Sequence, residues 1–360
     1  MTQEKTYHIP ATFKGKTAWR SPSNIAIVKY WGKKGFQLPI APSISMSLSR
    51  SFTETTVSYR PSPKPGKLTF EFLFEGNPQP AFAEKTEKYL GCLDEEMPFL
   101  KDLHLDIRSS NSFPHSAGIA SSAASMSALA LCLLSIEQAL KENPLNEAGF
   151  FQRASRLARM GSGSACRSVY PAWSLWGDSR GIAESSELYA IDINQHLHPV
   201  FQTLQDSILI VDSGKKAVSS SQGHEMMNSH PFLQERIIQA RENTQELWQA
   251  LHTGDLKSFM AIAEHEALTL HALMMSSKPG YVLTRPDTLK IIEKLYKFRD
   301  ETGTSICFTL DAGPNLHLLY PLEEKPKVLE WLETEVLDLC EDRRWIDDAV
   351  GSGPQLLNRE

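Results

Sequence analysis

The sequence predicts an α+β protein of two domains with a cleft between them. The chain has 360 residues, which is more than a single hydrophobic core usually organises. Its first half contains segments in which apolar and polar residues alternate, as they do in half-buried strands. Its second half is rich in segments with the apolar spacing of helices. We place the boundary near residue 195, which gives domains of residues 1–195 and 196–360.

The first domain is expected to begin with a sheet and to contain one central helix. The segment from about residue 120 to 140 is apolar nearly all round, so this helix should be buried. In chain order, the expected elements are strands at 16–30, 52–60 and 67–74, a helix at 83–97, a strand at 103–109, helices at 120–140 and 150–160, and strands at 169–177 and 188–193.

The second domain is expected to be a helix-rich α+β unit. Its first long helix has one apolar face, formed by Leu233, Ile237, Thr244, Leu247 and Leu251. The expected elements are a strand at 206–213, helices at 233–251, 256–275 and 287–301, strands at 305–313 and 316–320, and a helix at 325–339.

Composition excludes several classes of protein. The net charge of −6, without a long run of Lys or Arg, argues against binding to nucleic acid or to a membrane surface. The five cysteines are scattered and lack CxxC spacing, as expected for reduced thiols in a cytoplasm. We find no signal-peptide pattern, and the run "SALALCLLSI" is too short to span a bilayer. The sequence therefore favours a soluble protein that stays in the cytoplasm.

Two stretches of small residues are candidate anion sites. The first, "SNSFPHSAGIASSAAS" at 110–125, leads into the central helix, whose first N–H groups would be uncovered and carry partial positive charge. The second, "GSGSACRS" at 161–168, combines serine hydroxyls with Arg167, whose planar fork suits a carboxylate or phosphate. On its own, the first stretch fits a serine-capped, closely packed helix equally well.

Two further positions are candidates for chemistry. Lys29 and Lys33 lie four residues apart where a strand runs into a glycine turn, although two solvated lysines would give the same pattern. Asp311 ends an apolar strand before a Gly-Pro turn, a position that often lines a cleft but also fits a residue that stabilises its own turn.

Together these stretches resemble the mevalonate diphosphate decarboxylase family of the GHMP kinase superfamily. The resemblance runs over most of the chain and rests on six segments: "SNIAIVKYWGKKGFQLPIAPSISMSLS", "NSFPHSAGIASSAASMSALAL", "ARMGSGSACRSVY", "SSSQGH", "TLDAGPN" and "GSGP". It implies an N-terminal domain around a mixed sheet, a ferredoxin-like C-terminal domain and an active site between them. It also implies conversion of (R)-5-diphosphomevalonate to isopentenyl diphosphate, ADP, phosphate and carbon dioxide with ATP and Mg²⁺, usually by a cytosolic homodimer.

The resemblance also assigns roles to residues of this chain. Asp311 would orient the substrate's tertiary hydroxyl, Lys29 would face the reacting centre, and Arg167 would hold the substrate carboxylate. The remaining substrate contacts implied are Tyr30, Trp31, Lys33, Ser162 and Ser164. The ATP phosphates would lie against Ser116, Ala117, Gly118, Ile119, Ala120, Ser121 and Ser122, with Ser121 or Ser122 reaching the metal.

Some positions depart from the family pattern, and two other functions remain open. His115 and Ser116 stand where Thr-Ala is more common, and His224 stands where Met is usual. Ser221 and Gln222 replace an arginine of some members. A related GHMP enzyme acting on mevalonate or its monophosphate would keep the same phosphate loop. A catalytically silent homologue that serves as a scaffold is the alternative from another class.

Overall fold

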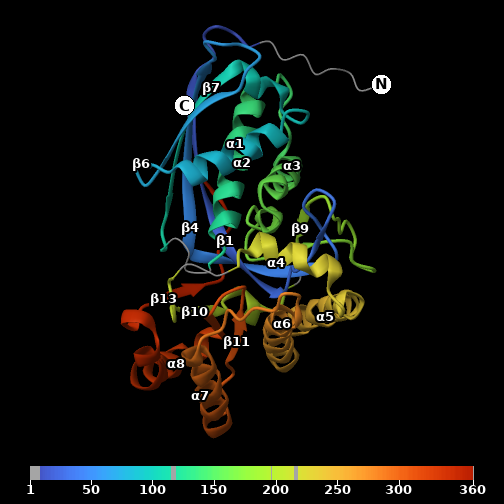
Figure 1. Ribbon diagram of the computed structural model, residues 1–360, viewed down its shortest axis with the longest axis vertical. Coiled ribbons are helices and arrows are strands. Elements are labelled where there is room, and N and C mark those ends of the chain that lie inside the picture. Colours follow the sequence, from blue (N-terminus) through green and yellow to red (C-terminus); the bar gives the residue numbers. More distant parts are fainter. Residues whose placement is uncertain (1–8, 115–118, 196, 215–217, 360) are drawn as a thin grey trace.

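Each of the two lobes is built around its own β-sheet (Figure 1). The computed structural model describes residues 9–114, 119–195, 197–214 and 218–359. The first lobe is formed by the first half of the chain and the second by most of the rest, so the predicted α+β class with two lobes is confirmed. The division at residue 195 stays a prediction.

An eight-stranded sheet forms the first lobe, in the order β14-β1-β4-β7-β5-β6, with β8 paired to β4 and β9 paired to β8. The sheet is mixed, because β5 lies parallel to β7 whereas its other pairs are antiparallel. Its strands are β1 (Gly15–Val28), β4 (Ser43–Pro61), β5 (Thr69–Phe74), β6 (Asn77–Pro78), β7 (Leu103–Asn111), β8 (Trp173–Trp176), β9 (Ala190–Asp192) and β14 (Gln355–Arg359). A separate ribbon joins β2 (Lys33–Lys34) to β3 (Leu38–Pro39).

In the described part of the first lobe, the α-helices are α1 (Pro80–Cys92), α2 (Ser121–Ala139) and α3 (Glu147–Gly161). By length and composition alone α2 could cross a membrane, but 78% of its most apolar window is buried inside the protein. It packs on the sheet through residues such as Leu131 and Leu133, which share a core with Val57 and Ile107. The prediction of a buried central helix is confirmed.

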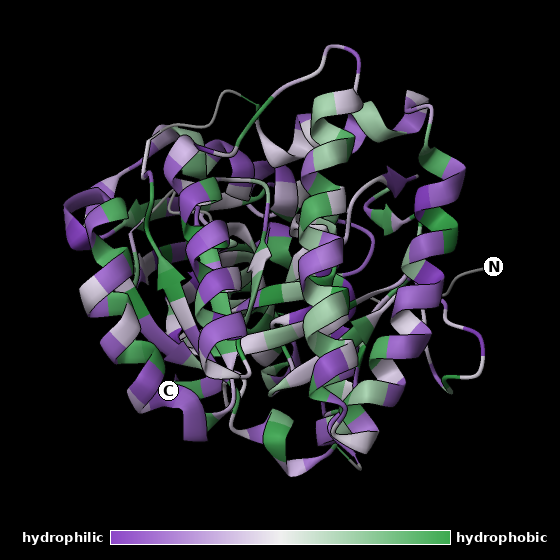
Figure 2. Ribbon diagram, turned by 90° about the horizontal axis from the view of Figure 1, so that it is seen from below, coloured by the Kyte–Doolittle hydropathy of each residue, from purple (hydrophilic) through white to green (hydrophobic). Residues whose placement is uncertain are grey.

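A four-stranded antiparallel sheet forms the second lobe, in the order β11-β12-β10-β13. This strand order and the alternation of strands and helices along the chain make the lobe ferredoxin-like. Its strands are β10 (Gln205–Leu209), β11 (Cys307–Leu310), β12 (Leu316–Tyr320) and β13 (Trp345–Ala349), and its α-helices are α4 (Ser220–Met226), α5 (Leu233–Thr253), α6 (Leu256–Ser276), α7 (Pro286–Thr302) and α8 (Lys325–Trp331). Figure 2 shows hydrophilic and hydrophobic residues alternating along its long helices, as amphipathic packing requires.

One hydrophobic core joins the two lobes. Ile25 and Ile44, on the long strands of the first sheet, belong to the same buried cluster as Ile208 and Phe259 of the second lobe. The end of the chain also returns to the first lobe, where β14 pairs antiparallel with β1 (Figure 1). The site between the lobes is therefore set in a continuous framework.

The structure corrects three details of the predicted elements. The buried face of α5 contains Arg236, Ala240 and Asn243, whereas Ile237 of the predicted apolar face is only partly buried. The helix expected at 325–339 is α8 followed by one π turn and one 3₁₀ turn. The strands β13 and β14 were not predicted, because polar residues interrupt both segments and their pairing partners lie far away in the sequence.

Candidate active site

A cavity of about 950 Å³ opens between the two lobes. The first lobe lines it with residues of β1, α2 and the turn after α3, and the second lobe contributes His224 and Asp311. Asp311 is the only carboxylate among the described lining residues, whereas the basic lining side chains are Lys29, Lys33, Lys85, Lys88 and Arg167. A wall of this charge attracts a polyanionic ligand.

The Lys29 side chain meets Asp311 across the lobe boundary. Lys29 directly follows β1 and Asp311 directly follows β11, so both lie at strand ends. Lys29 Nζ donates to Asp311 Oδ1 at 2.9 Å and to the Ala26 carbonyl at 2.6 Å. Burial lowers the pKa of Lys29 from its usual value, and the Asp311 carboxylate opposes this effect. The pair thus places one cation and one anion at the same point of the cavity wall.

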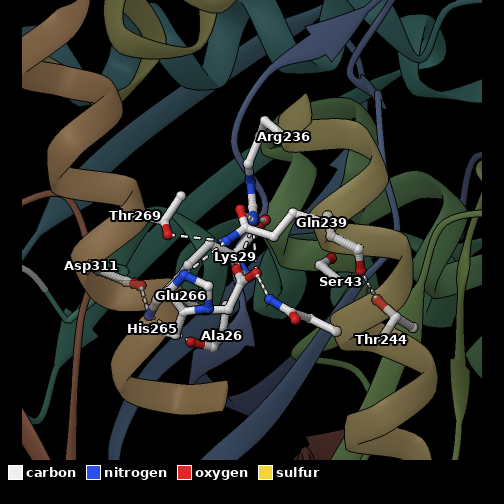
Figure 3. A network of polar contacts seen from close by, with 12 residues as sticks. Ala26, Lys29, Ser43, Arg236, Gln239, Thr244, His265, Glu266, Thr269 and Asp311 are labelled. Atoms are coloured by element: carbon white, nitrogen blue, oxygen red, sulfur yellow. Dashed lines mark hydrogen bonds and ion pairs between the residues drawn. The ribbon is translucent and has the colours of Figure 1, made fainter. Parts of the chain in front are cut away.

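The main chain of Lys29 is held from behind by a buried ion pair (Figure 3). Glu266 Oε2 on α6 accepts from the Lys29 N–H at 2.8 Å, and Arg236 Nη2 on α5 donates to the Lys29 carbonyl at 3.0 Å. Arg236 and Glu266 themselves are joined by two hydrogen bonds of 2.7 Å. The position of Lys29 is therefore fixed by helices of the second lobe.

Arg167 is buried at the cavity, and part of its guanidinium group is free to bind a ligand. It closes the 3₁₀ turn Gly163–Arg167, and its Nη1 donates to the Ser43 hydroxyl. Among the described residues, its buried Nε atom has no hydrogen-bond partner. Burial lowers the pKa of Arg167, with Asp311 among the groups that oppose this shift. A planar cation with an unsatisfied donor is suited to an anion that enters the cavity.

The N-terminus of α2 forms another part of the wall. Ala120 precedes it in the left-handed conformation (φ 44°), and no side chain of the described residues caps the helix. Ile119, Ala120, Ser121 and Ser122 all line the cavity. Uncapped N–H groups at the end of a 19-residue helix provide the donors and positive potential that a phosphate needs.

A smaller and more apolar pocket of about 90 Å³ adjoins this helix end. It shares Ser121, Ser122, Lys85 and Met126 with the large cavity. Its aromatic lining side chains are Phe72, Phe74 and Phe82. The pocket thus offers an apolar environment next to the uncapped helix.

His224 lies between two aromatic residues on the opposite wall. Its ring centroid is 4.3 Å from that of Tyr30 and 4.8 Å from that of Trp31. The Gly32 N–H donates to His224 Nδ1 at 3.0 Å, so the proton of the neutral ring is on Nε2. Burial, followed by the charges of Lys33 and Arg167, lowers the pKa of His224 to about 3. His224 is therefore neutral at physiological pH.

The structure brings the described sequence-predicted residues around this one cavity. Those lining it are Lys29, Tyr30, Trp31, Lys33, Ile119, Ala120, Ser121, Ser122, Ser162, Ser164, Arg167 and Asp311. The hydroxyls of Ser122 and Ser162 are 3.3 Å apart, so the two small-residue stretches meet. Ser116, Ala117 and Gly118, and likewise His115, lie outside the described residues.

Sequence reasoning missed the residues that support this site. The sequence analysis singled out neither Arg236 nor Glu266. The available signal was that Arg236 and Asn243, seven residues apart, share a helix face with Ala240 and Leu247. Ser43, the partner of Arg167, lies in a run of alternating serines that carries no comparable signal.

Comparison with known proteins identifies relatives of this chain along most of its length. A family model described as diphosphomevalonate decarboxylase-like N-terminal domain matches residues 21–187, and one described as mevalonate 5-diphosphate decarboxylase C-terminal domain matches residues 207–352. The diphosphomevalonate decarboxylase of Debaryomyces hansenii is 30% identical over 93% of this chain and 93% of its own length. The chain belongs to the diphosphomevalonate decarboxylase family.

Solved structures extend this family assignment to the fold. Mevalonate diphosphate decarboxylase from Staphylococcus aureus is 27% identical, with a TM-score of 0.81 over 96% of this chain and 99% of that chain. The structure described as MDDEF in complex with MVAPP, AMPPCP and magnesium is 25% identical, with a TM-score of 0.79 and the same coverage. The two-lobed fold is therefore that of the diphosphomevalonate decarboxylase family over nearly the whole chain.

Proposed function

We propose that this protein catalyses the ATP-dependent decarboxylation of (R)-5-diphosphomevalonate to isopentenyl diphosphate, ADP, phosphate and carbon dioxide. One observation carries the proposal: a single cavity is lined by part of each small-residue stretch, by Arg167 and by the Lys29–Asp311 pair. A reaction between two polyanions needs two anion sites and one group that orients the nucleophile between them. This cavity has those parts, in a chain of the diphosphomevalonate decarboxylase family.

ATP would occupy the wall formed by α2. Its phosphates would accept from the uncapped N–H groups that follow Ala120, and its purine base fits the aromatic side of the smaller pocket. The Ser121 and Ser122 hydroxyls are hard oxygen donors that fit Mg²⁺, an ion usually bound by few protein oxygens together with substrate phosphates. When bound, Mg²⁺ would neutralise charge that develops on the transferred phosphoryl group.

The second substrate would lie between Arg167 and Lys33. Lys33, Tyr30 and the hydroxyls of Ser162 and Ser164 would receive its diphosphate. Arg167 would hold its carboxylate through the guanidinium edge that includes the unpartnered Nε. This arrangement would bring the tertiary hydroxyl of the substrate near Asp311.

Asp311 would orient that hydroxyl for attack on the γ-phosphate and accept its proton. Because a tertiary alcohol is crowded, correct positioning contributes more than base strength. Lys29 holds the Asp311 carboxylate by its Oδ1 atom and brings positive charge to the place where phosphoryl transfer occurs.

Loss of the new phosphate would then drive decarboxylation. The C3–O bond breaks, its electron pair leaves with phosphate, and positive charge develops at C3. The bond to the carboxyl group supplies the electrons of the new double bond, and carbon dioxide departs. Asp311 favours the developing cation electrostatically, while Arg167 keeps the carboxylate in place.

The test is to incubate the protein with ATP, Mg²⁺ and either mevalonate, its 5-phosphate or its 5-diphosphate. We expect carbon dioxide and ADP in equal amounts from the 5-diphosphate, and no comparable release from the other two. Carbon dioxide from another substrate only, or ADP without carbon dioxide, would favour the related GHMP enzyme. No turnover with nucleotide binding retained would favour the scaffold.

We also propose that the protein works as a cytoplasmic homodimer without nucleic-acid or membrane partners. Its five cysteines are free, which supports a reducing compartment. The dimer rests on the family resemblance. Light scattering on the purified protein and fractionation of the source cells would test these two points.

A further inference from the structure

We propose that Arg236 and Glu266 are positioning residues that hold the main chain of Lys29, so that its ammonium group meets Asp311. The inference deepens the proposed function and rests on it. It concerns residues of α5 and α6 that line no part of the cavity described above. They act on the reaction through Lys29 alone.

Lys29 lies just beyond the last strand pair of β1, which joins Val28 to Ile44. Its N–H and carbonyl therefore lie beyond that β-ladder. The Arg236–Glu266 pair binds both groups, at 3.0 Å from Arg236 Nη2 to the carbonyl and 2.8 Å from the N–H to Glu266 Oε2. One ion pair thus fixes both polar groups of one peptide residue (Figure 3).

The position of the Lys29 ammonium group depends on this anchoring of the main chain. Lys29 Nζ donates back to the carbonyl of Ala26, three residues earlier in the chain, and also to Asp311. A side chain held at its tip by two short contacts transmits a shift of its own backbone to both. Movement of the Lys29 backbone would break the contact to Asp311, which belongs to the other lobe.

The ion pair is fully enclosed and well satisfied. The side chains of Arg236 and Glu266 are 3% and 0% exposed. Asn243 donates to Glu266 Oε1 at 2.6 Å, and Gln239 accepts from Arg236 at 2.9 Å. Burial acts to raise the pKa of Glu266, but Arg236, the Lys29 N–H and Asn243 outweigh it, so this pKa lies below its usual range.

Stability alone is a poor explanation for such a pair. Removing two charges from water costs about as much as their attraction returns, and apolar residues of similar size often serve the fold equally well. A fixed geometry is what a buried, fully bonded polar network supplies and an apolar pair does not. Here that geometry is the placement of Lys29.

The test replaces the pair with apolar residues in Arg236→Met/Glu266→Leu, which leaves no unpaired charge. A matched control exists on the same helix: Glu264 pairs with Arg299 of α7 at 2.7 Å, and neither residue lines the cavity. The control variant is Arg299→Met/Glu264→Leu. Arg236→Lys, which keeps the charge but loses the planar fork, provides a second route if the first variant does not fold.

We expect kcat with 5-diphosphomevalonate to fall about 100-fold in the Arg236→Met/Glu266→Leu variant, since a misplacement of 1 Å has effects of that order. KM should change less than about threefold, because the anion-binding residues are untouched. Arg236→Lys should lower kcat in the same sense, and the control variant should keep kcat within about twofold of the unmodified protein.

Crystal structures of these variants give a readout independent of turnover. We expect the Lys29 Nζ to Asp311 contact to be lost in the Arg236 variants and kept in the control. Retention of that contact, or equal losses of kcat in test and control variants, would overturn the inference. If the unmodified protein releases no carbon dioxide, the proposed function fails, and the crystallographic comparison still decides whether the pair positions Lys29.

Discussion

Lys29 Nζ and Asp311 Oδ1 lie 2.9 Å apart although the two residues are separated by 282 positions in the chain. The bond joins the end of β1 in the first lobe to the end of β11 in the second. The Lys29 side chain is 2% exposed and that of Asp311 is 29% exposed, so the acid faces the cavity and the lysine supports it from behind. This asymmetry supports the substrate-facing role that we propose for Asp311.

Asp311→Asn should abolish turnover while leaving nucleotide binding nearly intact. The amide keeps the size of the side chain but no longer accepts a proton from the substrate hydroxyl, an effect of about 100- to 10,000-fold on kcat. Steady-state kinetics would measure the loss, and calorimetric titration with a non-hydrolysable ATP analogue is the control. Near-normal turnover would remove Asp311 from the mechanism.

Arg167→Lys should weaken binding of the diphosphate substrate and not of ATP. Lysine keeps the positive charge but loses the fork that includes the unpartnered Nε. We expect KM for 5-diphosphomevalonate to rise about 10- to 100-fold, or ~1.4 to 2.8 kcal/mol. KM for ATP serves as the internal control. An equal rise for both substrates would contradict a specific carboxylate contact.

Gly163→Ala should impair the site by displacing Tyr30. A Cβ atom at Gly163 would lie 2.7 Å from the Tyr30 hydroxyl oxygen and 2.9 Å from its ring, closer than side chains tolerate. Gly91→Ala on α1 is the matched control, because a Cβ there meets nothing within 4 Å. We expect a higher KM for 5-diphosphomevalonate in the first variant only, measured by initial rates. Similar kinetics in both would show that Tyr30 does not contact the substrate.

His224 should make the protein less stable in acid. The unfolded chain takes up a proton near pH 6.5, whereas the folded protein binds it at His224 only near pH 3. Protonation below pH 6.5 therefore favours the unfolded state, with a cost to folding of about 2 kcal/mol between pH 7 and pH 5.

Comparison with His224→Gln isolates this effect, because glutamine fills similar space and does not titrate. Urea unfolding at pH 7 and pH 5 would measure the free energies. We expect the unmodified protein to lose more stability than the variant on acidification. Equal losses in the two proteins would mean that His224 titrates normally in the folded state.

The residues proposed as catalytic were accessible to sequence reasoning because each follows a local pattern. Lys29 follows a strand and precedes the turn at Gly32, whose φ of 95° requires glycine, and Asp311 follows an apolar strand before a Gly-Pro turn. The uncapped start of α2 was visible as a run of small residues. These signals involve only neighbouring residues, so they can be recognised without knowledge of tertiary contacts.

The residues that hold the site in place were not accessible in this way. Glu266 lies within an apolar helix, and nothing near it in the sequence indicates that Arg236, 30 residues away, neutralises it. The same applies to β13 and β14, whose partners β10 and β1 are distant in the chain. Long-range pairing decided these elements, and local propensity carries little information about it.

The return of the chain end to the first sheet gives the lobes two covalent connections instead of one. The second connection is itself fastened: Asp348 Oδ1 accepts from the Ser49 and Arg50 N–H groups at 2.8 Å, and the Gly351 N–H bonds the Ser47 carbonyl at 2.8 Å. The lobes are therefore connected by two segments of the chain, and hydrogen bonds hold the second segment to the first lobe. Two such connections restrict the rigid rotations that one lobe can make relative to the other more than a single connection would.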